Sequence, residues 1–168
     1  MDTPSAPYVA FLESDAAGDT WVADHDDPDL ITWSGFTEGT EAIVFTKIKS
    51  RRITAIPGNV AEVVSGGNTF EYRTGKRFYR FQYVFQLSSR SEVNMVTKFP
   101  MLEAHTEKTS WKYYYLIDVN GTDDHIAFVD EDGSPKSYAP VHIQQMIENW
   151  DSGNNLIHNI MVQGVTVW

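Results

Sequence analysis

Residues 146–168, MIENWDSGNNLIHNIMVQGVTVW, decide the fold predicted for this chain. Two apolar runs, 146–150 and 156–168, flank a segment of residue types that close tight turns or tolerate positive φ, namely Asp151, Ser152, Gly153 and Asn154. The pattern predicts a β-hairpin. From residue 160 onward both alternating faces carry apolar residues, so this strand belongs either between two layers or under a neighbouring subunit.

The segment 141–150, just before the turn, fits two structures. Ile143, Met146, Ile147 and Trp150 have the i, i+3, i+4, i+7 spacing of an amphipathic helix. The segment is also short and abuts a turn and a strand, so it fits an extended edge as well. Periodicity alone leaves helix and strand open.

Further from this stretch, the chain is dominated by strand patterns. The clearest is 78–87, where aromatic and polar residues alternate and one face is expected to enter a core. We expect it to return in a hairpin from 70–73 across Thr74-Gly75, and we expect 111–119 and 125–129 to pair across Asn120-Gly121. Other predicted strands are 8–12, 20–23, 30–36, 42–48, 53–56 and 60–64. Ser89 and Glu92 form a capping box that predicts one short α-helix at about 89–99.

The length and composition indicate a single domain, residues 1–168, able to bury about 70 % of the surface that the unfolded chain exposes. With no cysteine, no apolar run of about 20 residues and no basic flank near residue 1, we expect no disulfide, membrane span or secretory signal, and synthesis in a reducing cytosol. The net charge of −10 is distributed in blocks: 1–46 and 113–168 are acidic and 47–112 is basic. The blocks fit either a mixed surface or patches that meet between subunits.

Residue patterns that carry chemistry are sparse. The acidic loop 24–29 suggests calcium, but it lacks the Gly and the Glu of a helix-loop-helix site, which favours a solvated loop. The basic and aromatic run 76–81 suggests nucleic-acid stacking, but its aromatic residues share one strand face, which favours core packing. The histidines have no metal-ligand spacing, and no nucleophile or phosphate-loop motif is present. We expect no enzyme activity, no catalytic residues, no cofactor and no metal.

The C-terminal stretch resembles the end of the tail tube proteins of contractile-tailed bacteriophages. The residues that carry this resemblance are Trp150, Asp151, Ser152, Asn154, Leu156 and Trp168, preceded by Pro140, Ile143, Met146 and Asn149. A second similarity covers 53–58, Gly75 and 78–85. The two touch about half of the chain, and the N-terminal part, 1–41, lies outside them.

The resemblance implies a mainly β fold, an antiparallel β-sandwich or barrel with one flanking helix, and a strand at 141–150. It implies a structural protein of the phage virion, made in the host cytoplasm, that self-assembles into stacked hexameric rings. The hollow channel would pass DNA during ejection without specific binding, and sheath and baseplate proteins would be further partners. A tube initiator, baseplate or tail-completion subunit is a related alternative.

The charge blocks suggest where subunits meet. We predict that Lys47, Lys49, Arg51 and Arg52 pair with acidic residues of a neighbour, either Asp24, Asp26, Asp27 and Asp29 or Asp130 and Asp132. Two hypotheses compete with self-assembly. One is a monomeric β-barrel or lectin-like module that binds a ligand through Trp21, Trp33 or Trp111, and the other is a small barrel enzyme.

Overall fold

A computed structural model describes residues 1–13, 31–57, 59–65, 68–74, 78–87, 114–121, 124–130, 132–150 and 158–167. Every strand pairing in these residues is antiparallel, and their one helical element is a 3-10 turn, η2 (Trp33–Gly35). The longer strands are β1 (Tyr8–Glu13), β2 (Ala42–Phe45), β3 (Ile48–Ile56), β4 (Asn59–Ser65), β5 (Asn68–Thr74), β6 (Phe78–Leu87), β7 (Tyr114–Gly121), β11 (Ala139–Trp150) and β12 (His158–Thr166). The short ones are β8 (Asp124–His125), β9 (Phe128–Val129) and β10 (Pro135–Lys136).

The main sheet has the strand order β2-β1-β7-β11-β12-β6-β3, with β8 beside β7. The sheet forms two layers, and β11 takes part in both of them. Only Ala139–Val141 of β11 pair with β7, whereas β12 pairs along it as far as Trp150, with a register shift between Ile143 and Gln145. The layers face each other, and the ring of Phe45 in β2 stacks on that of Phe85 in β6 at 3.9 Å between centroids. The predicted mainly β, sandwich-like fold is confirmed, without a closed barrel.

The register shift in β11 explains the ambiguous pattern at 141–150. A β-bulge adds one residue to a strand and so changes the alternation of its side chains. Ile143 before the shift and Met146 after it both pack against the same core, although they are three residues apart. The i, i+3 spacing of Ile143 and Met146 is therefore produced by a bulged strand, whereas Ile147 faces the other side of the sheet. The hairpin predicted from the C-terminal stretch is confirmed as β11 paired with β12.

Two apolar clusters lie on the two faces of β1, β2 and β7. Between the layers, the aromatic face of β6 packs on Phe11, Phe45 and Leu116, with Tyr79, Phe81, Tyr83, Phe85 and Leu87 all buried as its alternation predicts. The opposite face of β1 is covered by Trp33 and Phe36. Strands buried on both faces carry apolar residues at successive positions, as β1 does from Tyr8 to Leu12.

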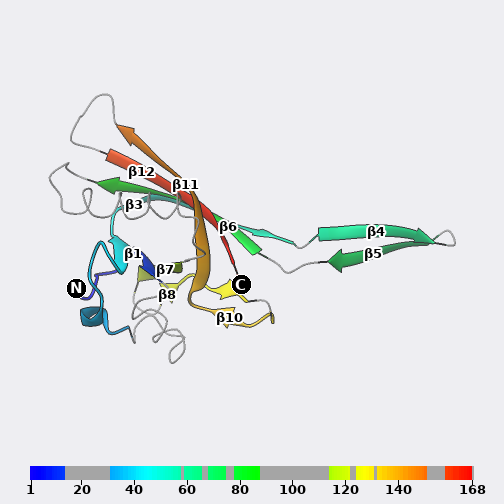
Figure 1. Cartoon of the computed structure of the whole chain (residues 1–168), viewed down its shortest axis with the longest axis horizontal. Coiled ribbons are helices and arrows are strands. Elements are labelled where there is room, and N and C mark those ends of the chain that lie inside the picture. The colour runs from blue at the N-terminus through cyan, green and yellow to red at the C-terminus, as the bar shows by residue number, and fades with distance from the viewer. Residues whose placement is uncertain are drawn as a thin grey trace.

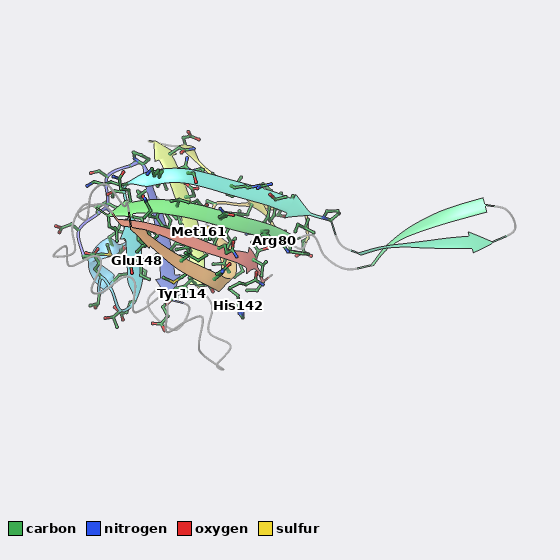
Figure 2. The ribbon with its side chains drawn as sticks, turned by 90° about the horizontal axis from the view of Figure 1, so that it is seen from above. Arg80, Tyr114, His142, Glu148 and Met161 are labelled. Atoms are coloured by element: carbon green, nitrogen blue, oxygen red, sulfur yellow. The ribbon has the colours of Figure 1, made fainter. Side chains whose placement is uncertain are left out.

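Strands β4 and β5 form a hairpin that extends away from the two layers as an arm (Figures 1 and 2). This pairing corrects the predicted hairpin between 70–73 and 78–87, since β5 pairs with β4 and β6 pairs with β3 and β12. Segment 30–36 was expected to be a strand, but its described part contains η2, because Trp33 and Phe36, three residues apart, both reach the cluster on β1. The predicted strand 42–48 ends at Phe45, and β3 continues through the basic residues that were expected to interrupt it.

The predicted helix at 89–99 lies outside the described residues, as do the predicted strand 20–23 and the acidic loop 24–29. In the described part of the chain, no helix has both the length and the apolar character needed to cross a membrane.

Candidate assembly surface

The layer β3-β6-β12-β11 has one face toward the core and one toward the outside, which we call the outer face. Figure 2 shows these four strands side by side. The pairing register places the outward residues in three rows across the strands: Ser50, Val84, Met161 and Ile147; Arg52, Gln82, Gln163 and Gln145; Thr54, Arg80, Val165 and His142. Val84, Met161 and Ile147 are half-buried, so the first row leaves a partly exposed apolar stripe on the outer face.

The second and third rows border a hollow of about 430 Å³ between β3 and β11. We call it the Arg52/Arg80 hollow. Its lining residues are Arg52, Thr54, Ile56, Arg80, Phe81, Gln82, Gln144, Gln163 and Gly164. The polar side chains among them are guanidinium groups, amides and a hydroxyl, and none is a carboxylate or a histidine. Such a lining offers hydrogen-bond donors for an anionic group.

Gly164 shapes this hollow through a close approach of two strands. A Cβ atom at Gly164 would lie 2.0 Å from the carbonyl oxygen of His142 and 2.7 Å from Cζ of Phe81. The glycine pairs with Ile143, directly beside the register shift of β11. The absence of a side chain therefore lets β11 and β12 stay together at the bulge.

The outer face is basic although the chain as a whole is acidic. The residues of the three rows include Arg52 and Arg80, both exposed, and no Asp or Glu. Within the described residues neither guanidinium forms an ion pair with a carboxylate. In a protein of net charge −10, a face of this composition attracts acidic groups.

The basic residues predicted to act together are divided between two environments. Lys47, Lys49 and Arg52 are exposed, as a subunit contact requires. Arg51 instead points between the layers, where its Nη2 lies 3.0 Å from Oδ1 of Asp118 on β7. Its Nη1 also donates a hydrogen bond to the side-chain oxygen of Asn120. Arg51 thus joins the two layers of its own chain, and alternation along β3 explains why it differs from Arg52.

Asp118 is the acidic residue that the sequence analysis missed. Its side chain is fully buried, and Oδ2 accepts a hydrogen bond of 2.9 Å from the hydroxyl of Tyr83. Burial raises the pKa of the Asp118 carboxyl, and the hydrogen bond from Tyr83 and the charge of Arg51 offset only part of this effect. The signal in the sequence was a single carboxylate inside the apolar run 113–119, two residues after Leu116, which faces the core.

Asp130 and Asp132 lie in the turn between β9 and β10. Oδ1 of Asp130 accepts hydrogen bonds from the backbone N–H of Asp132, at 3.0 Å, and of Ser134, at 2.8 Å. Asp132 itself is exposed. The other predicted contact residues, Asp24, Asp26, Asp27 and Asp29, lie outside the described residues.

The residues of the tail-tube motif lie mostly beyond the described chain. Trp150 is the last residue of β11, and its backbone pairs with His158. Asp151, Ser152, Asn154, Leu156 and Trp168 are outside the described residues. For the ligand-binding alternative, Trp33 is only 3 % exposed and offers no binding surface, while Trp21 and Trp111 are outside this part of the chain. Among the described side chains, no group of three His, Asp or Glu is placed to hold a metal ion.

Comparison with known proteins gives a coarse likeness of fold. No family model matches the chain, and no curated protein matches it. Its structure is similar to a chain in the six-fold symmetrised cryo-EM structure of the baseplate of the anti-feeding prophage, with a TM-score of 0.41 and 12% sequence identity. The similarity covers 98% of this chain and 92% of that chain. A TM-score below 0.5 is a weak likeness.

Proposed function

We propose that this protein is a non-enzymatic structural subunit of a phage tail tube, which acts by binding copies of itself. In this proposal the subunits form hexameric rings, and the rings stack into a hollow channel through which DNA passes without specific binding. The proposal starts from the resemblance of the C-terminal hairpin to tail tube proteins.

The observation that carries the proposal is the outer face of β3-β6-β12-β11. Val84, Met161 and Ile147 form a half-buried apolar row on a face that the described residues of a single chain leave partly open. Apolar surface gains roughly 25 cal/mol for each Å² that a neighbour removes from water. A second copy that covers this row would therefore stabilise an assembly.

The β3 edge of the main sheet supports the same interpretation. Within the described residues, β3 pairs with β6 alone. An unpaired strand edge is a site where another chain can add, and an exposed basic residue such as Arg52 limits which chains do so. Selective pairing at such edges suits ordered assembly better than aggregation.

The charge distribution bears on which surfaces contact other subunits and which line the channel. Guanidinium groups along a channel wall would bind DNA phosphates and oppose sliding. In our proposal the basic outer face therefore contacts other subunits, and acidic parts of the chain line the channel. Repulsion of DNA by such a wall acts within a Debye length of about 8 Å at physiological ionic strength.

The test is the assembly state of the purified full chain. Sedimentation velocity and negative-stain electron microscopy over a range of protein concentrations should show rings or tubes. Long tubes would identify a main tube protein, and isolated rings or short stacks an initiator or terminal subunit. A stable monomer at the highest soluble concentration would overturn the proposal, and saturable binding of a glycan by that monomer would favour a ligand-binding module.

A further inference from the structure

We propose that the Arg52/Arg80 hollow receives the acidic tip of the β9–β10 hairpin of a second copy. We define the acidic tip by Asp130, Asp132, Gly133 and Ser134. This inference rests on the proposed self-assembly and names the contact that produces it. Of the basic residues that the charge blocks predicted to meet a neighbour, the contact uses Arg52, together with Arg80, and leaves out Lys49 and Arg51.

The hollow is suited to a carboxylate. Arg52 and Arg80 are exposed, and each presents a planar guanidinium that can bind a carboxylate through two parallel hydrogen bonds. The side chains of Thr54, Gln144 and Gln163 add donors around the same space. No lining residue is acidic, so an incoming carboxylate meets no like charge.

The acidic tip is held in one shape before it meets a partner. Besides the two bonds that its side chain accepts, Asp130 donates its backbone N–H to the carbonyl of Ser134 at 3.0 Å. Gly133 donates to the carbonyl of Asp130 at 3.2 Å and has a φ of 88°, which a glycine adopts without strain. A preformed turn loses little conformational entropy on binding, and it leaves the carboxylate of Asp132 exposed for a partner.

The occupant is a second copy because the two surfaces are complementary and separate. None of the residues of the acidic tip lines the Arg52/Arg80 hollow. A contact between two different patches of the same chain is heterologous, and heterologous contacts close into rings or continue as helical filaments. This is the symmetry that the proposed function requires.

A pair of charge reversals tests the contact. Arg80→Glu places a carboxylate in the hollow opposite Asp132 of the tip, whereas Asp132→Arg places a guanidinium on the tip opposite Arg80. Either variant alone should assemble at least about tenfold more weakly than the wild type, because positions 80 and 132 then carry like charges at every contact. An equimolar mixture should recover rings in which the two variants alternate, since positions 80 and 132 then carry opposite charges at every contact.

Two controls separate this contact from general charge effects. Lys49→Glu reverses a positive charge, as Arg80→Glu does, but on an exposed residue of β3 that does not line the hollow. The Lys49→Glu variant should therefore assemble as the wild type does. Arg52→Glu should reproduce the effect of Arg80→Glu. Circular dichroism and thermal unfolding check that each variant is folded, as the exposure of the substituted residues predicts.

The outcomes distinguish this inference from the function on which it depends. Normal assembly of Arg80→Glu and Asp132→Arg would overturn the contact and leave self-assembly intact. Failure of the wild type to assemble would overturn the proposed function itself. If the wild type binds a fluorescent DNA duplex and Arg52→Glu and Arg80→Glu abolish that binding without changing assembly, the hollow binds a polyanion and the proposed contact is wrong.

Discussion

Replacement of Gly164 by alanine tests whether the close approach of β11 and β12 is essential to the sandwich. The new Cβ would lie 2.0 Å from the carbonyl oxygen of His142, whereas ordinary contacts begin at 3.4 Å. The obstacle is a backbone atom beside the register shift, so it cannot be relieved by a rotamer change. The carbonyl is held in a strand that serves both layers, and its movement would disturb the pairing with β12 and the packing of Phe81.

Overpacking of this kind costs about 1–3 kcal/mol, and a backbone obstacle places Gly164→Ala at the upper end of this range. The assay is urea unfolding followed by tryptophan fluorescence, with the free energy of unfolding taken from midpoint and slope. Gly121→Ala is the matched control, because a Cβ at Gly121 meets nothing within 4 Å. We expect the control to be neutral or slightly stabilising. Equal free energies of unfolding for the two variants would refute the close-approach argument.

Three further variants address the interior. Asp118→Asn should make stability less dependent on pH in the acid range. The raised pKa of Asp118 means that the folded state binds this proton more tightly than the unfolded state, so wild-type stability falls as pH rises from 3.8, the usual pKa, through the raised pKa. Thermal melts of wild type and variant across this pH window measure the difference. Tyr83→Phe removes the hydrogen bond that lowers the pKa of Asp118, so the fall in stability with rising pH should extend to higher pH than in the wild type. An unchanged pH profile of stability would refute the role of the hydroxyl. Phe85→Ala removes a fully buried ring stacked on Phe45 and should lower the free energy of unfolding by about 3–5 kcal/mol in urea titrations, a loss under 1 kcal/mol being incompatible with that packing.

Strands with a strict alternation were predictable from the sequence because burial on one face determines which residues can occupy it. The aromatic series of β6 was identified in this way and is present. The C-terminal hairpin was identified from turn residues between two apolar runs, and β11 pairs with β12 as expected. The order of strands in the sheet was not predictable. The sequence gives no direct information on which distant strand lies beside β6, and the hairpin expected with 70–73 was wrong because β6 pairs with β3 and β12 instead.

The candidate surface was only partly predictable for the same reason. The charge blocks indicated that β3 would carry basic residues, and Arg52 is exposed on it. Arg80 comes from a strand that is remote in the sequence, and only the register brings it beside Thr54 and into the hollow with Arg52. The inward turn of Arg51 depends on Asp118, which is 67 residues away along the chain and meets it only across the two layers.

The carboxylate-free outer face has a practical consequence for preparing the protein. A molecule of net charge −10 would be expected to pass through a cation-exchange column, yet one face presents Arg52 and Arg80 to a sulfonated resin. On glow-discharged carbon, which is negatively charged, the same face would settle first and give grids with a preferred orientation. Supports of opposite charge should therefore display different views of single subunits.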